Sequence, residues 1–328
     1  MAKIVLGIGT SHSPLLSTPP EHWETGHSAK DRRDYADIFE ERSRQNAPWI
    51  GPELTMERWL QKYTAVQDAI CRLGEVLAEV KPDVAVIVGD DQQEVFKHEA
   101  RPALAAYWGE SLHVVPPDMN DVQDFRRFSK WAEYGDEPVT YQCEPSLGKH
   151  LVESLIEQDF DVMALNRLPE GRQIGHAYNF VCRRVMNGNA LPYVPIMLNV
   201  FFGLNQPTVG RCYALGKALR QAIDGWESDK TVALVASGGL SHTVIDEDLD
   251  RGILAAMQEK DEKGMTSWAE ERFHFPGKFG FGTGETKSWV TVAGAMAEKD
   301  LEMHLVDYIP CYRTTAGTGV GAAFAYWK

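Results

Sequence analysis

The sequence predicts an α/β fold with a mostly parallel central sheet and helices on both faces, in a single large domain over residues 1–328. Short apolar runs typical of buried strands alternate with segments whose apolar residues recur at helical spacing. The strand-like runs end abruptly in small or polar residues, as Lys3–Ile8 does before Gly9-Thr10-Ser11-His12. The 328 residues, 44% of them hydrophobic, suffice to bury a large core.

The first half of the chain begins with this strand. Residues 14–55 are polar and predict a long loop. Together with the helical segment that follows, this loop forms a predicted insertion over about residues 14–80. Met56–Val80 has the apolar spacing of an amphipathic helix, and Val84–Val88 reads as a buried strand. Residues 97–145 are rich in Pro, Asp and aromatic residues and predict irregular structure.

The second half continues the alternation of helices and strands. Helices are expected at Leu147–Gln158, Gly175–Met186, Thr208–Ile223, Asp246–Glu262 and Glu285–Ala297. Strands are expected at Phe160–Leu165, Tyr193–Val200, Lys230–Ala236, Met303–Tyr308 and Gly319–Trp327.

Charge and cysteine usage exclude several classes of partner. A net charge of −14 and a pI of about 5.2 argue against binding to nucleic acid or to an anionic membrane surface. No apolar run approaches the roughly 20 residues of a membrane helix, and the apolar stretch at the start is too short for a signal peptide. The five cysteines are dispersed, which predicts reduced thiols and a cytoplasmic location.

Polar side chains follow three of the expected strands. They are His12, the cluster Asp90-Asp91-Gln92, and His242, while Glu285 opens a helix. In a parallel sheet such positions converge on one edge. Two neutral donors and one carboxylate, with coordination positions left open, are how non-haem Fe(II) enzymes hold their metal, and a further histidine can act as general base.

Each of these residues also has a purely structural explanation. His12 could be a hydrogen-bonded structural histidine, and Glu285 could simply favour a helix N-terminus through the helix dipole. Asp90 and Asp91 could form a solvated turn. His22 and His27 lie in a polar segment and are expected at the surface.

Over nearly its whole length the chain resembles the class III extradiol dioxygenases, the superfamily of the protocatechuate 4,5-dioxygenase β subunit. The most specific match is Ser237-Gly238-Gly239-Leu240-Ser241-His242. The other matching motifs are Thr10-Ser11-His12-Ser13-Pro14, the strand Val84–Val88 with its acidic end, Ile174-Gly175-His176, Asn205-Gln206-Pro207, Gly210-Arg211-Cys212-Tyr213-Ala214-Leu215-Gly216, Gly284-Glu285 with Trp289, Gly294-Ala295-Met296, Ile309-Pro310 and Thr315-Ala316-Gly317-Thr318.

The resemblance implies a role for each matching residue. It implies that His12 and Glu285 are iron ligands, that His242 is the catalytic acid/base, and that His176 contacts the substrate. The implied reaction is Fe(II)-dependent cleavage of a catechol-like ring, in aromatic catabolism, with O₂ as co-substrate. It also implies a homodimer, and some relatives need a small helical partner subunit.

One position departs from the family pattern. The second iron ligand is normally a histidine after the strand that matches Val84–Val88, and here Gln92 stands in its place, or Gln93 if the gap is placed differently. A glutamine carbonyl is neutral like imidazole but is a weaker and harder donor. Weaker iron binding is therefore expected, or recruitment of another ligand, for which the candidates are Asp90, Asp91 and His98.

Two further questions stay open at this point. The chain could instead be a metal-dependent hydrolase or other non-oxidative enzyme on the same scaffold, or a non-catalytic homologue that lost its metal with the histidine. In the segment Phe273–Gly284, the residues Phe273, Phe275, Phe279 and Phe281 alternate with glycines. They could be packing residues or form a mobile lid over an aromatic substrate.

Overall fold

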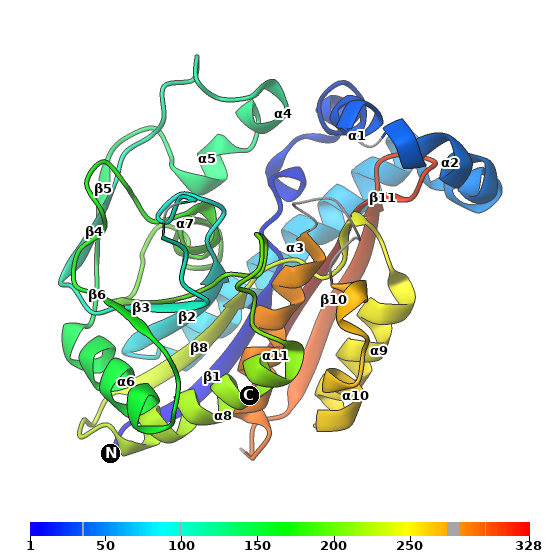
Figure 1. Ribbon diagram of the computed structural model, residues 1–328. Helices are drawn as coiled ribbons and strands as arrows, with labels where there is room; N and C mark the ends of the chain where they lie inside the picture. The colour runs from blue at the N-terminus through cyan, green and yellow to red at the C-terminus, as the bar shows by residue number, and fades with distance from the viewer. Residues whose placement is uncertain (35, 99, 274–281, 299) are drawn as a thin grey trace.

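In the computed structural model a large mixed sheet carries helices on both faces (Figure 1). The structure describes residues 1–34, 36–98, 100–273, 282–298 and 300–328. Within these residues nine strands form one sheet, in the order β10-β11-β1-β8-β2-β7-β3-β6 with β9 paired to β11. The strands of this sheet are β1 Lys3–Thr10, β2 Val84–Asp90, β3 Leu104–Tyr107, β6 Met163–Leu165, β7 Tyr193–Leu198, β8 Thr231–Ser237, β9 His242–Val244, β10 Met303–Tyr312 and β11 Thr318–Trp327.

The centre of the sheet is parallel and its margins are not. Strand β8 pairs in parallel with β1 and β2, and β2 pairs in parallel with β7. On one side β11 runs antiparallel to β1 and β10, and on the other β3 runs antiparallel to β7. The predicted α/β fold is thus confirmed, with a mixed sheet whose parallel core brings the ends of β1, β8 and β2 to one edge.

Helices cover the two faces of the sheet unequally. One face packs against α6, α8, α9, α10 and α11, and the other against α3 and α7 with the π turn η5 (Figure 1). The helices are α1 Ala29–Asp34, α2 Ala36–Ile50, α3 Met56–Val80, α4 Asp124–Arg127, α5 Lys130–Glu133, α6 Pro145–Glu157, α7 His176–Phe180, α8 Val209–Gly225, α9 Glu247–Gln258, α10 Glu262–Thr266 and α11 Thr286–Met296. Short 3-10 or π turns are η1 Pro14–Ser17, η2 Pro20–His22, η3 Trp23–Ser28, η4 Gly51–Glu53, η5 Val181–Val185, η6 Glu270–Arg272 and η7 Gly282–Glu285.

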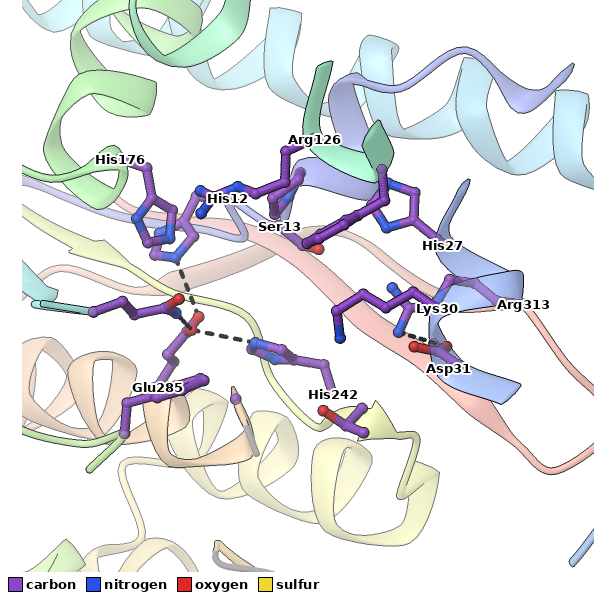
Figure 2. A pocket seen from close by; sticks show the side chains of 17 residues that line it. His12, Ser13, His27, Lys30, Asp31, Arg126, His176, His242, Glu285 and Arg313 are labelled. Atoms are coloured by element: carbon purple, nitrogen blue, oxygen red, sulfur yellow. Dashed lines mark hydrogen bonds and ion pairs between the residues drawn. The ribbon is translucent and has the colours of Figure 1, made fainter. Parts of the chain in front are cut away.

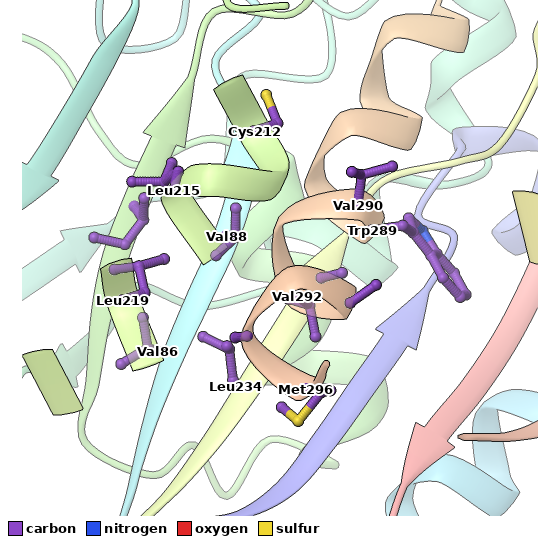
Figure 3. Close-up of a cluster of buried hydrophobic side chains, with 14 of the residues drawn as sticks. Val86, Val88, Cys212, Leu215, Leu219, Leu234, Trp289, Val290, Val292 and Met296 are labelled. Atoms are coloured by element: carbon purple, nitrogen blue, oxygen red, sulfur yellow. The ribbon is translucent and has the colours of Figure 1, made fainter. Parts of the chain in front are cut away.

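Strand β2 shows why the sheet needs helices on both sides. All seven of its residues are buried, and successive side chains enter opposite cores. Val86 and Val88 pack with Leu215 of α8 and Val292 of α11 (Figure 3), whereas Ile87 belongs to the core under α3. A strand buried on both faces reads as a continuous apolar run, which is how the sequence revealed it.

The two helices on the first face approach each other closely through a glycine. A Cβ atom placed on Gly216 of α8 would collide with the backbone carbonyl of Thr291 in α11. This contact presses α11 onto the sheet and thereby fixes Glu285, which stands at the N-terminal end of α11.

The segment of residues 14–55, predicted as a loop, is instead largely helical. It holds η1, η2, η3, α1, α2 and η4. Helix α2 is rich in charged and polar residues, and no regular apolar period marks it because most of its described side chains face solvent. Its tertiary contacts include a hydrogen bond from Arg42 to the carbonyl of Ala316.

The segment 97–145, predicted as irregular, also contains regular structure. Strand β3 joins the main sheet, and β4 Ser111–Val114 pairs with β5 Val139–Gln142 in a separate two-stranded sheet. These strands have four residues each, too few to show a period. Conversely, the strand expected at Phe160–Leu165 is shorter and covers only β6.

No helix in the described ranges has the length and apolar character that crossing a membrane requires.

Candidate metal centre and active site

Four sequence-predicted residues meet at the carboxyl edge of the parallel strands. His12 follows β1, Gln92 follows β2, His242 begins β9 just after β8, and Glu285 stands before α11. His176, at the first turn of α7, joins them (Figure 2). All five line one cavity of about 200 Å³. The convergence predicted from the strand ends therefore exists in the structure.

Glu285 is the hub of this cluster and is 1% exposed. Its Oε2 lies 3.2 Å from His12 Nε2 and accepts a hydrogen bond from the Gly239 amide at 2.8 Å. Its Oε1 lies 3.2 Å from His242 Nε2 and accepts from Gln92 Nε2 at 3.0 Å. Burial alone would raise the pKa of Glu285, but His242 and His12 overcome it and hold that pKa well below the usual range. The carboxylate is therefore ionised.

The hydrogen bonds of His12 determine which of its nitrogens is free. His12 Nδ1 lies 2.9 Å from Ser237 Oγ, and that hydroxyl donates its single proton to the carbonyl of Ala177 at 2.6 Å. Nδ1 must therefore be the donor, which leaves a lone pair on Nε2. Burial lowers the pKa of His12, more than Glu285 raises it, so the ring is neutral. A neutral imidazole with a free Nε2 is the form that binds metals.

Asp90, at the end of β2, is buried beside His12. Its Oδ1 lies 3.6 Å from His12 Nε2. Within the described ranges neither oxygen of Asp90 has a hydrogen-bond partner, and the same holds for His12 Nε2. Burial and then the charge of Glu285 raise the pKa of Asp90 well above its usual value. Buried polar atoms without partners are costly, so their occurrence side by side indicates that a further group belongs between them.

His176 lies against His12 and is paired with a residue that the sequence did not single out. The two imidazole centroids are 4.7 Å apart at an angle of 76°. His176 Nδ1 is 2.6 Å from Glu94 Oε1. Burial opposes the charge on both groups, but each partner stabilises the other, with the pKa of His176 raised to about 9 and that of Glu94 lowered to about 2. Ligand atoms of His12, Asp90 and His176 all lie within 4.8 Å of one another.

The residues that could replace Gln92 as a metal ligand differ in their positions. Gln92 lines the cavity, but Asp90, Asp91, Gln93 and His98 are not among its lining residues, and of these four Asp90 lies beside His12, behind the cavity wall. Asp91 instead accepts hydrogen bonds from the backbone amides of Val95 and Phe96 and so shapes the turn after β2. His98 is exposed.

His242 is arranged to hold or release a proton at Nε2. Its Nδ1–H donates to the carbonyl of Leu240 at 2.9 Å, and its Nε2 faces Glu285 and the cavity. Burial opposes protonation, yet the charge and hydrogen bond of Glu285 outweigh it and raise the pKa of His242. The ring carries a proton more readily than a free histidine, which suits a residue that takes a proton from a substrate hydroxyl.

One end of the cavity is cationic. It is lined by His27, Lys30, Arg126 and Arg313, with Asp31 as an acidic neighbour (Figure 2). Burial, and then the charges of Arg313, Lys30 and Arg126, lower the pKa of His27 well below its usual value, so that ring is neutral. Each permanent cation also contacts a carboxylate, in the pairs Lys30–Asp34, Arg126–Glu133 and Arg313–Asp31.

Sequence reasoning missed this cationic end. His27 was expected at the surface, yet it is 2% exposed, and Lys30 lies in the segment predicted as a loop. Arg126 lies in the segment predicted as irregular. No motif marks these residues, because they come together only through the fold.

The expected lid is only partly within the described residues. Phe275, Phe279 and Phe281 lie outside them. Phe273 is fully buried and packs in the core beside α8 and α11, so the interpretation as a packing residue is the right one for that position.

Comparison with known proteins identifies the family of the chain. Residues 60–321 match the family described as the catalytic LigB subunit of aromatic ring-opening dioxygenase, and the chain belongs to that family. The predicted resemblance to the class III extradiol superfamily is thereby confirmed. The match takes in Gln92, His176, His242 and Glu285, while His12 precedes it.

Individual relatives are more distant. A gallate dioxygenase of Pseudomonas putida strain KT2440 is 33% identical over 102 residues, which are 30% of this chain and 28% of that protein. An uncharacterized protein of Escherichia coli K12 has a solved structure that covers 78% of this chain and 91% of its own, with 13% identity and a TM-score of 0.48.

Proposed function

We propose that the chain is a non-haem Fe(II)-dependent dioxygenase that cleaves the ring of a catechol-like aromatic acid by extradiol chemistry. One observation carries the proposal. The free Nε2 of His12 and the ionised Glu285 lie together, buried, at the wall of a cavity that His242 also lines. Membership of a ring-opening dioxygenase family supports the same reaction.

The donor atoms present fit a ferrous ion. Imidazole and carboxylate are the ligand types of non-haem iron sites, and the unpartnered Asp90 oxygens beside His12 Nε2 leave a polar gap that a cation would fill. His12 and Glu285 would hold the ion together with a ligand from the end of β2. Bound Fe(II) supplies the redox chemistry by which the aromatic substrate reacts with O₂.

The other steps, proton transfer and positioning of the substrate, would fall to side chains of the protein. His242 Nε2 would accept a proton from a substrate hydroxyl and return it to the product, since it is the nitrogen that faces the cavity. Glu285 would keep that proton close by its 3.2 Å contact with the same nitrogen. His176 would complete the centre beside His12, with the two ring centroids 4.7 Å apart.

The cationic end of the cavity favours a substrate that carries a carboxylate. Arg126 and Arg313 could pair with that group, because guanidinium forks match carboxylates in two parallel hydrogen bonds. The relative named gallate dioxygenase supports the same choice, since gallate is a hydroxylated aromatic carboxylate. The proposed substrate is therefore a polyhydroxybenzoate rather than an unsubstituted catechol.

The test is anaerobic loading with Fe(II), removal of excess metal, and measurement of oxygen uptake over a panel of gallate, protocatechuate, catechol and 2-aminophenol. We expect uptake that is fastest with the carboxylated members, and we expect Arg313→Met to raise their KM more than that of catechol. Absence of both metal binding and uptake would overturn the proposal. Turnover under argon with zinc bound would instead support a non-oxidative enzyme.

Assembly and location remain predictions from the sequence. We propose a homodimer in the cytoplasm, with the helical segment of residues 14–80 standing where some relatives use a small partner subunit. Light scattering on the purified chain, with and without Fe(II), measures the first of these directly.

A further inference from the structure

We propose that the second histidine of the metal centre is His176 from α7, held in place by Glu94, and that Asp90 is the ligand from β2. On this assignment Gln92 is a hydrogen-bond donor to Glu285 and does not bind the metal. The inference rests on the proposed function, because it concerns the same metal. It changes which elements of the fold build the centre.

The first step concerns the atoms that lack partners. Buried hydrogen-bonding atoms are almost always satisfied in folded proteins. His12 Nε2 and both carboxylate oxygens of Asp90 are exceptions within the described residues, and one of those oxygens is 3.6 Å from that nitrogen. Glu285, in contrast, already contacts Gly239, His242 and Gln92. The buried atoms that lack a partner are therefore those between His12 and Asp90, and not those of Glu285.

The second step concerns the tautomer of His176. Glu94 Oε1 lies 2.6 Å from Nδ1, while Glu94 Oε2 accepts from the backbone amide of Gln92 at 2.6 Å. A carboxylate on Nδ1 leaves Nε2 as the atom that a metal can bind by displacing its proton, and carboxylate–histidine–metal arrangements of this kind orient the ring and increase its basicity. Glu94 thus does for His176 what Ser237 does for His12.

The third step concerns distance. Ligand atoms of His12, Asp90 and His176 lie within 4.8 Å of one another. Ligands about 2.1 Å from a shared ion are separated by ~3 Å when adjacent and ~4.2 Å when opposite. The widest separation exceeds these values by at most about 0.6 to 1.8 Å, so side-chain movements of roughly 1 Å bring the three atoms onto one ion. Glu285 Oε2 already lies 3.2 Å from His12 Nε2.

The fourth step concerns Gln92. Its side-chain nitrogen lies 3.0 Å from Glu285 Oε1. The opposite amide orientation would set two oxygens against each other beside an anion, so the donor orientation is the stable one. In that orientation the amide neutralises part of the Glu285 charge and holds the carboxylate in position.

The experiment measures metal affinity rather than activity. Wild type and the variants His176→Gln, Asp90→Asn, Glu94→Gln and Gln92→Met are titrated anaerobically with Fe(II), and separately with Co(II), whose absorption spectrum reports ligand number and type. His113→Gln, which changes an exposed histidine far from the cavity, is the matched control. Circular dichroism and thermal melting check that each variant folds.

The expected result has a clear order. His176→Gln and Asp90→Asn weaken binding of both metals at least ~100-fold and change the Co(II) spectrum, and Glu94→Gln weakens it ~10-fold. Gln92→Met, which removes a hydrogen bond to Glu285, weakens binding ~10-fold but leaves the Co(II) spectrum unchanged, because no ligand is lost. His113→Gln binds with wild-type affinity and spectrum. If His176→Gln fails to fold, Glu94→Gln and Asp90→Asn carry the test alone.

Failure of the inference is distinct from failure of the proposed function. If wild type binds Fe(II) but Gln92→Met loses it while His176→Gln and Asp90→Asn retain it, the ligand assignment is wrong and the proposed dioxygenase stands. If wild type binds neither metal, both are overturned.

Discussion

The turns after β8 and after β2 meet at one cavity but are built in different ways. After β8, the motif Gly238–His242 has its polar groups paired: Asp250 accepts from the amide and hydroxyl of Ser241 and from Tyr308. After β2, both oxygens of Asp90 lack partners among the described residues. The neighbouring Asp91, in contrast, accepts hydrogen bonds from the amides of Val95 and Phe96 with its two oxygens.

This difference separates two requirements of the site. The β8 turn holds His242, the proposed acid/base, in one orientation through hydrogen bonds within the protein. The β2 turn buries Asp90 with neither oxygen paired among the described residues, and burial raises the pKa of Asp90, so its carboxyl group is neutral unless a cation binds beside it. The polar groups of the β8 turn thus find their partners within the protein, whereas those of Asp90 in the β2 turn would find theirs in a bound ligand.

Glu285→Gln gives the largest expected effect, because Glu285 contacts residues from both turns. Loss of the charge removes the proposed metal ligand and the anion that raises the pKa of His242. We expect the bound iron to fall below detection and kcat/KM to fall at least ~10³-fold. Metal analysis and oxygen uptake measure the two losses, and a variant that keeps both would show that Glu285 is only a helix-terminal residue.

His242→Gln tests the β8 turn alone. The amide can occupy the place of the ring but cannot take up a proton at the cavity face. We expect kcat to fall by ~10²–10⁴-fold with metal content unchanged. Parallel loss of metal would mean that the two turns are not separable in the way described above.

Asp250→Asn has the smallest expected effect and sharpens the description of the β8 turn. Burial raises the pKa of Asp250 to about 7 despite its hydrogen bonds from Ser241 and Tyr308. An unfolded aspartate titrates near ~3.9, so the native state holds an extra proton between these two values. The stabilising contribution is therefore complete below about pH 4 and is lost as the pH rises through about 7.

The measurement is the free energy of unfolding in urea at several pH values from about 5 to 8. Wild type should lose more stability across this range than Asp250→Asn, in which the group no longer titrates. Equal slopes for the two proteins would show that Asp250 has an ordinary pKa in the folded state.

What the sequence could predict follows the same division. The β8 turn was found because glycines, serine and histidine stand together in one local motif. The parallel core was found because strands such as β2 are continuous apolar runs. Glu94 and Arg313 were not found, since nothing local distinguishes them from surface charges and their partners lie far away along the chain.

The helices of residues 14–55 were missed for a related reason. Their side chains are mostly polar, so no apolar period reveals them, although they bring His27 and Lys30 to the cavity. The departure at Gln92 was visible in the sequence. Asp90 was among the replacements that the sequence suggested, but His176 was not, because only the fold brings it beside His12 and Asp90.

The hydroxyl of Ser237 has a wider consequence than the tautomer of one ring. It links three elements, since it belongs to β8, contacts His12 after β1, and bonds to the carbonyl of Ala177, the residue after His176 in α7. A single oxygen atom thus connects the ring of His12 to the backbone that carries His176. A change that moves α7 relative to the sheet must therefore either move His12 as well or break one of the two hydrogen bonds of Ser237. The spacing of the two histidines depends in this way on how α7 packs against the sheet.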